Sequence, residues 1–268
     1  MKRRFQLLMM VFSVLALSSC AFDPPRPVAQ PIPAAPTPAG DPVEGLRLAT
    51  IVGCNGCHTK TGEGKVFHEE PGYRGVAPNL TVRRELYTDA GISDLLRRGQ
   101  TRDGHRPIGM PIQGYQHLTD QNVQDIIAWL RWLPPVPSPD VPATMVSEQL
   151  KPSLLAGTYP LPEAAVDSSQ VHDAAQDSRK IALGRRLAYV ACAECHGGDL
   201  VHPSLSIAPP LVVAKIYDTA QFSRLMLTGT TAAGTESTTG LMSKVARARF
   251  SVLTQDEVQA LKLYLDGR

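Results

Sequence analysis

The sequence predicts an all-α fold in which two similar halves are joined by a proline-rich linker. Two observations lead to this prediction. The pattern C-x-x-C-H occurs at residues 54–58 and again at 192–196, and each copy follows a stretch whose apolar residues recur at helical spacing. Apolar and polar residues alternate nowhere for long enough to indicate a sheet. We therefore expect short helices wrapped around bound groups, in place of one large apolar core.

Both halves are expected to contain the same series of helices. A first helix leads into C-x-x-C-H, over residues 44–52 and 180–190. A middle helix follows, where residues 92–99 align without gaps on residues 222–229. A last helix begins at Thr119 or Thr254, both suited to the N-cap position, and stops near Pro134 or Gly267. This matching order predicts an internal duplication, with globular regions at 43–134 and 179–268.

The N-terminus has the pattern of an export signal. Basic residues 2–4 precede an apolar run over residues 5–17, which is short for a membrane-spanning helix of about 20 residues. Leu17-Ser18-Ser19-Cys20 resembles the lipobox of bacterial lipoproteins. We predict a signal peptide over residues 1–19 and a lipid on Cys20. The alternatives are an ordinary secretory signal with an incidental cysteine, or an uncleaved anchor.

Two segments have compositions that do not favour a core of their own. Residues 20–42 are rich in Pro and Ala and predict an extended tether. Residues 135–178 form a Pro-rich, acidic linker, of which Met145 to Leu155 is expected to fold as a short helix against one domain.

The formal charge of +2 is nearly balanced, and no basic block is interleaved with aromatic residues. Nucleic acid is therefore not an expected partner.

C-x-x-C-H is the attachment pattern of a c-type haem. Its two thiols add across the porphyrin vinyl groups, and the following histidine binds the iron. A zinc knuckle or a thiol-redox pair is the alternative for one copy, but two copies that both end in His favour two covalently attached haem c groups. The residues concerned are Cys54, Cys57, His58, Cys192, Cys195 and His196.

The second axial ligand decides the chemistry of each iron. In the first half the candidate is Met110, between Gly109 and Pro111 on a polar loop, and a thioether ligand suits an electron carrier. A methionine that fills an apolar gap is the alternative, and His105 is a competing ligand.

In the second half Met226 and Met242 compete. Met226 aligns with Leu96 of the middle helix, whereas Met242 falls in the same loop as Met110, so Met242 is preferred. His202 or an open coordination site remains as the alternative.

A proline follows each haem motif after a loop, in Ala77-Pro78-Asn79-Leu80 and in Ala208-Pro209-Pro210-Leu211. Its carbonyl is placed to accept a hydrogen bond from the nitrogen of the axial imidazole that does not bind iron. A plain turn is the alternative.

These motifs resemble the class I c-type cytochromes in a two-domain, two-haem form. The resemblance covers both globular regions and implies that the first and last helices of each half cross, at Gly45 with Trp129 and at Gly184 with Tyr264. It also implies that haem is bound by the residues already named, with Pro78 and Met110 in the first half and Pro209 and Met242 in the second. The second half departs from the family in having Ser after the Met and a shorter segment between His196 and Pro209.

The hypothesis from the sequence is an exported dihaem cytochrome c, anchored by lipid to a membrane in the bacterial periplasm. It would relay single electrons without being an enzyme. Its expected partners are a periplasmic dehydrogenase as donor and an oxidase or another cytochrome as acceptor. One alternative is a dihaem peroxidase-like enzyme with one five-coordinate iron and His202 as the base. The other is a haem-based sensor, or a haem subunit of a larger respiratory or dehydrogenase complex.

Overall fold

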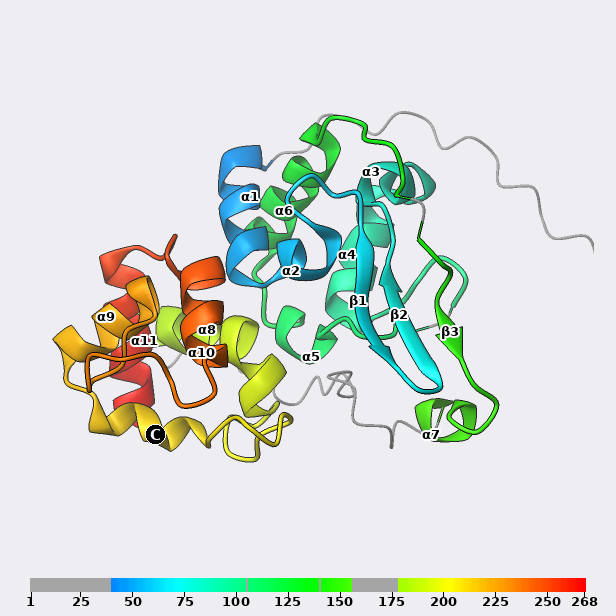
Figure 1. The fold of residues 1–268 in the computed structure, drawn as a ribbon. Coiled ribbons are helices and arrows are strands. Elements are labelled where there is room, and N and C mark those ends of the chain that lie inside the picture. The colour runs from blue at the N-terminus through cyan, green and yellow to red at the C-terminus, as the bar shows by residue number, and fades with distance from the viewer. Residues whose placement is uncertain (1–39, 105, 140, 156–177) are drawn as a thin grey trace, which may run out of the picture. The chain divides into compact units, whose positions relative to one another are not determined.

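The computed structural model describes residues 40–104, 106–139, 141–155 and 178–268 (Figure 1). Cys20, the predicted signal peptide, most of the predicted tether and His105 lie outside these ranges. The elements in chain order are α1 (Pro42–Ile51), α2 (Cys54–His58), β1 (Lys65–Glu70), β2 (Tyr73–Ala77), α3 (Leu80–Arg83), η1 (Arg84–Leu86), α4 (Asp89–Arg98), α5 (Ile112–Tyr115), α6 (Asp120–Trp132), β3 (Met145–Val146), α7 (Lys151–Leu155), α8 (Arg179–His196), η4 (Leu211–Ile216), α9 (Thr219–Thr228), α10 (Leu241–Val245), η5 (Ala246–Phe250) and α11 (Gln255–Asp266).

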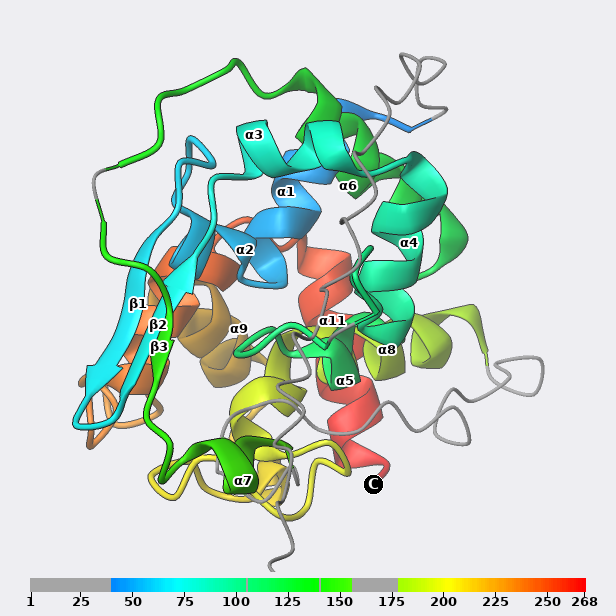
Figure 2. The ribbon, with the colours of Figure 1, turned by 90° about the vertical axis from the view of Figure 1, so that its right-hand side faces the viewer.

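In the first half, α1 crosses α6 at very close range (Figure 2). Gly45 makes this approach possible, because a Cβ at that position would lie 1.8 Å from the carbonyl oxygen of Asp125 and 2.8 Å from the Cβ of Trp129. Thr119 caps α6, and its side chain and that of Asn122 form a capping box. The helix ends at Trp132, as the position of Pro134 predicts.

In the second half, α8 crosses α11 in the same manner. A Cβ on Gly184 would lie 2.0 Å from the carbonyl oxygen of Ala260 and 2.9 Å from the Cβ of Tyr264. Thr254 caps α11 with a capping box that includes Glu257. The middle helices also correspond, since α4 and α9 end at Gly99 and Gly229 in left-handed conformations with φ of 64° and 76°.

The expectation of an all-α fold is wrong for one segment. Residues 65–77 form the antiparallel hairpin β1–β2, and β3 adds to β2 to give a three-stranded sheet in the order β1-β2-β3. The two strands flank Pro71-Gly72, a turn pair that requires positive φ at Gly72, where φ is 89°. The sequence holds the turn signal, but the strands are too short for their alternation to be noticed.

The part of the linker that the structure describes contains two elements. The region expected to fold as one short helix, Met145 to Leu155, instead begins as strand β3 and then forms α7. Because β3 pairs with β2, this part of the linker packs on the first half. The segment 156–177 lies outside the described residues.

Side chains of both halves contribute to one buried apolar cluster. Helix α5 packs on α8, where a Cβ on Gly114 would lie 2.9 Å from the carbonyl oxygen of Tyr189. An ion pair between Arg47 and Glu257, 2.8 Å long, also joins the halves. Among the described residues, no helix combines the length and the apolar character needed to cross a bilayer.

Candidate functional site

The first C-x-x-C-H motif forms the short helix α2, set off from α1 by a tight turn. Helix α1 stops at Ile51, and Gly53 adopts a φ of 90°, which the absence of a Cβ permits. The turn redirects the chain so that Cys54 and Cys57 stand as free, half-buried thiols one helical turn apart. Two thiols at this spacing are suited to bonding one edge of a planar macrocycle.

His58 is oriented by a hydrogen bond to the turn that carries Pro78. Its Nδ1 donates to the carbonyl oxygen of Pro78 at 2.9 Å, since a carbonyl can only accept. Burial lowers the pKa of His58, while the hydrogen bond to Pro78 acts in the opposite direction. A neutral imidazole with Nδ1 occupied leaves Nε2 as the metal-binding atom, with its tautomer fixed by the proline.

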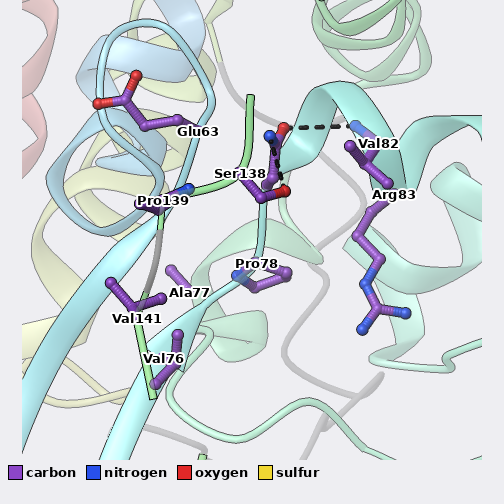
Figure 3. Close-up of a pocket in the computed structure, with 10 residues that line it drawn as sticks. Glu63, Val76, Ala77, Pro78, Val82, Arg83, Ser138, Pro139 and Val141 are labelled. Carbon is purple, nitrogen blue, oxygen red and sulfur yellow. Dashed lines mark hydrogen bonds between the residues drawn. The ribbon is translucent and has the colours of Figure 1, made fainter. Parts of the chain in front are cut away.

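The position of Pro78 is fixed by the residues around it. Asn79 caps α3 by accepting from Thr81 N at 2.8 Å, and its Nδ2 donates to the carbonyl oxygen of Val136 at 2.9 Å. The start of the linker therefore closes over the turn that carries Pro78. A pocket of about 320 Å³ lies at this place, and Pro78, Arg83 and Ser138 are among the residues that line it (Figure 3). The cysteines, His58 and Met110 do not line it, so it shares Pro78 with the predicted haem site but none of the predicted attachment or iron-binding residues.

Met110 lies on the loop before α5, half-buried against the apolar cluster. The hairpin reaches this loop, because a Cβ on Gly109 would lie 2.6 Å from the ring of Phe67 on β1. Gly109 also has a φ of 82°, and Ile112 N donates to the carbonyl oxygen of Met110 at 2.8 Å. The thioether of Met110 thus lies on a short segment whose backbone conformation is fixed by these contacts.

The second C-x-x-C-H motif ends the long helix α8, with no break before it. Cys192 and His196 are buried and Cys195 is half-buried. His196 Nδ1 donates to the carbonyl oxygen of Pro209 at 2.7 Å. Burial lowers the pKa of His196, and the hydrogen bond to Pro209 opposes this shift. The hydrogen bond expected between the histidine and the proline carbonyl is thus present in both halves.

The two candidate methionines of the second half have different surroundings. Met226 is 4% exposed in the interior face of α9, whereas Met242 is half-buried at the start of α10. The end of each middle helix packs close to the candidate loop methionine. Gly99 lies against Ile112, two residues after Met110, and Gly229 lies against the carbonyl of Ser243, one residue after Met242. This correspondence favours Met242 over Met226.

Ser243, which departs from the proline of the first half, has a structural task of its own. It is fully buried, and its Oγ accepts from Ser237 N at 2.8 Å. In return, Ser243 N donates to Ser237 Oγ at 3.3 Å. These bonds close the loop before Met242, a role that the ring of Pro111 takes in the first half by restricting the backbone.

His202 does not have the surroundings of a base above an iron. Its side chain is 86% exposed, and Nδ1 pairs with Asp199 at 2.6 Å. Its backbone carbonyl lies against Gly197, the residue after His196. His202 therefore belongs to the loop beside His196, whereas the base of a peroxidase-like site would have to lie on the opposite face of any haem bound there.

The thiols of both motifs lie in a common electrostatic environment. Burial raises the pKa of Cys54 and that of Cys192 to about 12, and the positive charge of Arg249 lowers both in part. Arg249 comes from η5 and was not singled out by sequence reasoning. No motif marks it, because its contacts to the two halves arise only on folding.

The donor set of each half fits a covalently bound haem. Two free thiols adjoin a histidine whose Nδ1 is engaged, and a half-buried methionine follows, Met110 on a loop and Met242 in the first turn of α10 rather than on the expected loop. Exposed apolar side chains flank these groups, including Ile108 near Met110 and Ile207 near Pro209, and a porphyrin face would cover such surface. Within the described ranges, no group of three or more His, Cys, Asp and Glu side chains is arranged to hold a metal ion by itself.

Comparison with known proteins agrees with this donor set for the first half. Residues 43–134 match the family model described as cytochrome c. The match supports a cytochrome c domain over this range and implies a covalently bound haem c within it. Residues 179–268 lie outside the match. No curated protein matches the chain.

Proposed function

We propose that this protein is a dihaem cytochrome c, with the matched cytochrome c domain followed by a second one at residues 179–268. The observation that carries this proposal is the paired hydrogen bond from each motif histidine to a proline carbonyl, His58 to Pro78 and His196 to Pro209. The parallel close approaches at Gly45 and Gly184 support the same conclusion.

The assignment of ligands follows from the same residues. Cys54 and Cys57 would hold one haem, and Cys192 and Cys195 the other. His58 with Met110, and His196 with Met242, would be the axial pairs. A haem bound in this way supplies a one-electron Fe(II)/Fe(III) couple. The protein's own groups orient the imidazoles, keep them neutral and shield the ligand atoms from water.

We further propose that the protein is an electron carrier in the bacterial periplasm, tethered to a membrane through a lipid on Cys20. With both axial positions taken by His and Met, substrate has no place at either iron. The partners would be other redox proteins: a periplasmic dehydrogenase as donor, and an oxidase or another cytochrome as acceptor. The exposed, Asp199-paired His202 does not favour the peroxidase-like alternative.

The central test is the haem content and ligation of the purified protein. We expect two haems per chain that resist acidified organic solvent, low-spin iron in both, and a weak long-wavelength band typical of Fe(III)–Met ligation. One high-spin iron together with turnover of peroxide would instead identify an enzyme. Extraction of the pigment by the solvent would disprove covalent attachment.

The tether is tested separately with Cys20→Ser. If Cys20 carries the lipid, the variant should move from the membrane fraction to the soluble fraction, because a chain without acyl groups has little affinity for a bilayer. Immunoblots of the two fractions measure the distribution. Unchanged partitioning would argue against lipidation at Cys20 while leaving the haem assignments intact.

A further inference from the structure

A largely buried ion pair joins the second C-x-x-C-H segment to an arginine that also contacts the chain just before the first one. Arg249, on η5 of the second half, donates from Nη1 to Oε2 of Glu194 at 2.7 Å. Their side chains are only 13% and 33% exposed. Glu194 is the residue between Cys192 and Cys195 that directly precedes Cys195, so the pair adjoins the second attachment site.

The other side of Arg249 adjoins the first attachment site. Its Nε donates to the carbonyl oxygen of Ile51 at 3.0 Å, three residues before Cys54. The guanidinium also lies over Gly53, where a Cβ would be 2.7 Å from Cζ of Arg249. One guanidinium therefore contacts the residue before Cys54 and the residue before Cys195.

The side chains around the Arg249–Glu194 pair limit the access of water to it. Tyr115 is 4% exposed, and its hydroxyl donates to the carbonyl oxygen of Val52 at 3.3 Å. The last carbonyls of α1, which have no partner within the helix, are thus bonded by Arg249 and Tyr115. Charges in such a place are screened by water and salt much less than charges on the surface.

The ion pair is expected to contribute little to the net stability of the fold. Removing two charges from water costs free energy that their attraction only partly returns, and apolar side chains of similar size often pack as well. A buried charge does, however, act strongly on any neighbouring group whose charge changes. Reduction adds one electron to a haem, so a nearby cation favours the reduced form and a nearby anion favours the oxidised form.

We propose that the Arg249–Glu194 pair sets the reduction potentials of both haem sites together. Arg249 stabilises the reduced state at each site, and Glu194 stabilises the oxidised state. The inference rests on the proposed dihaem function and adds a positioned charge that the two sites share. Arg249 contacts both attachment segments, and Glu194 belongs to the second one. Their charges act on the haem sites electrostatically, without binding iron.

The test uses the full-length, haem-loaded protein and a redox titration resolved into two one-electron midpoints. Arg249→Gln removes the cation and leaves Glu194 unpaired, so both midpoints should fall. The equilibrium constant for reduction should drop roughly tenfold at each site, which is about 59 mV for a one-electron couple. Glu194→Gln should raise both midpoints, and the double variant should shift them less than either single variant.

Two further variants separate charge from packing. Arg47→Gln breaks the ion pair with Glu257 that joins the halves, and also the pair with Glu44, and should leave both midpoints unchanged. Arg249→Lys keeps the charge, so its two midpoints should stay close to those of the wild-type protein. If Arg249→Gln does not fold, the upward shift in Glu194→Gln still decides the question.

Shifts of the same sign in both single variants would overturn the inference, since that result indicates loosened packing. A shift in Arg47→Gln as large as that in Arg249→Gln would do the same. Two bound haems with unmoved midpoints would overturn the inference and leave the proposed function standing. A wild-type protein with one haem or none would overturn both.

Discussion

The two histidines of the C-x-x-C-H motifs are oriented by backbone, not by other side chains. Each ring donates a hydrogen bond from Nδ1 to the carbonyl oxygen of a proline, with an N···O distance of 2.9 Å for His58 and 2.7 Å for His196. A proline carbonyl is a suitable acceptor because the fixed φ of the ring limits how far the turn can move. The direction of Nε2 in each ring is therefore set by the turn that carries the proline.

The choice between Met242 and Met226 can be tested by substitution. Met242→Ala should open the second iron to added ligands such as imidazole or cyanide, with little loss of stability, because the side chain is half-buried. Met226→Ala should leave the spectrum unchanged but lower the free energy of unfolding by about 2–5 kcal/mol, because it empties a buried position. Ligand-binding spectra and chemical denaturation measure the two effects. The reverse pattern would show that Met226 is the ligand.

At the scale of elements, the helix crossings depend on glycine in both halves. Gly45 and Gly184 occupy equivalent positions on α1 and α8, and each faces a backbone carbonyl of the last helix. Any side chain there would push the two backbones apart. The crossings hold the helices that lead into both C-x-x-C-H motifs, so they also determine where the cysteines lie.

We expect Gly45→Ala and Gly184→Ala to destabilise the fold by about 3 kcal/mol or more, because the new Cβ would overlap backbone that cannot move aside easily. Gly198→Ala is a matched control, since open space surrounds that position. Thermal unfolding of the three variants measures the difference. A loss in Gly198→Ala equal to the others would mean that the crossings are not the cause.

The elements also show where sequence patterns succeed and where they fail. Thr119 and Thr254 cap their helices as expected, because capping depends on residues a few positions apart. The hairpin at 65–77 was not predicted, since its strands are short and β2 gains β3 from the distant linker. Pairing between segments that far apart leaves no local pattern.

At the scale of the whole molecule, His117 lies where the two halves meet. Its ring stacks on Tyr189 of α8 with centroids 4.2 Å apart. Within the described residues, its Nε2 is buried and has no hydrogen-bond partner. Burial lowers the pKa of His117 to about 4, so the folded protein holds this ring neutral where the unfolded chain would protonate it.

This shift predicts a loss of stability in acid. The contribution of neutral His117 to the free energy of unfolding is complete above pH 6.5, the ordinary pKa of histidine. It declines as the pH falls toward 4, because the unfolded chain then binds a proton that the folded protein does not. Since the ring is partly exposed to water, the loss should be on the order of 1 kcal/mol. Denaturation across this pH range measures it, with His117→Phe as the control that keeps the stacked ring but cannot titrate. An identical pH profile in the two proteins would contradict the prediction.

The proposal of two separate haem sites can be tested in the intact chain. Replacing Cys192 and Cys195 by Ser should halve the haem content per chain and leave the first site attached, because Cys54, Cys57 and His58 belong to another half. Absorbance of the haem relative to protein, after extraction with acidified solvent, measures the content. Unchanged haem content would contradict the proposal of a second covalent site.

The sequence by itself determined the features that depend on near neighbours. Both C-x-x-C-H motifs and the caps of the last helices follow from residues a few positions apart. The recurrence of a proline 20 and 13 residues after the motif histidine indicates the acceptors of the two imidazole hydrogen bonds. The tertiary structure alone decided the hairpin, the strand at 145–146 and the position of Arg249 between Ile51 and Glu194. The hairpin itself is local, but its strands are short. The pairing of β3 with β2 and the contacts of Arg249 join segments separated by tens to hundreds of residues, and their free energy comes from burial and pairing that exist only in the folded chain.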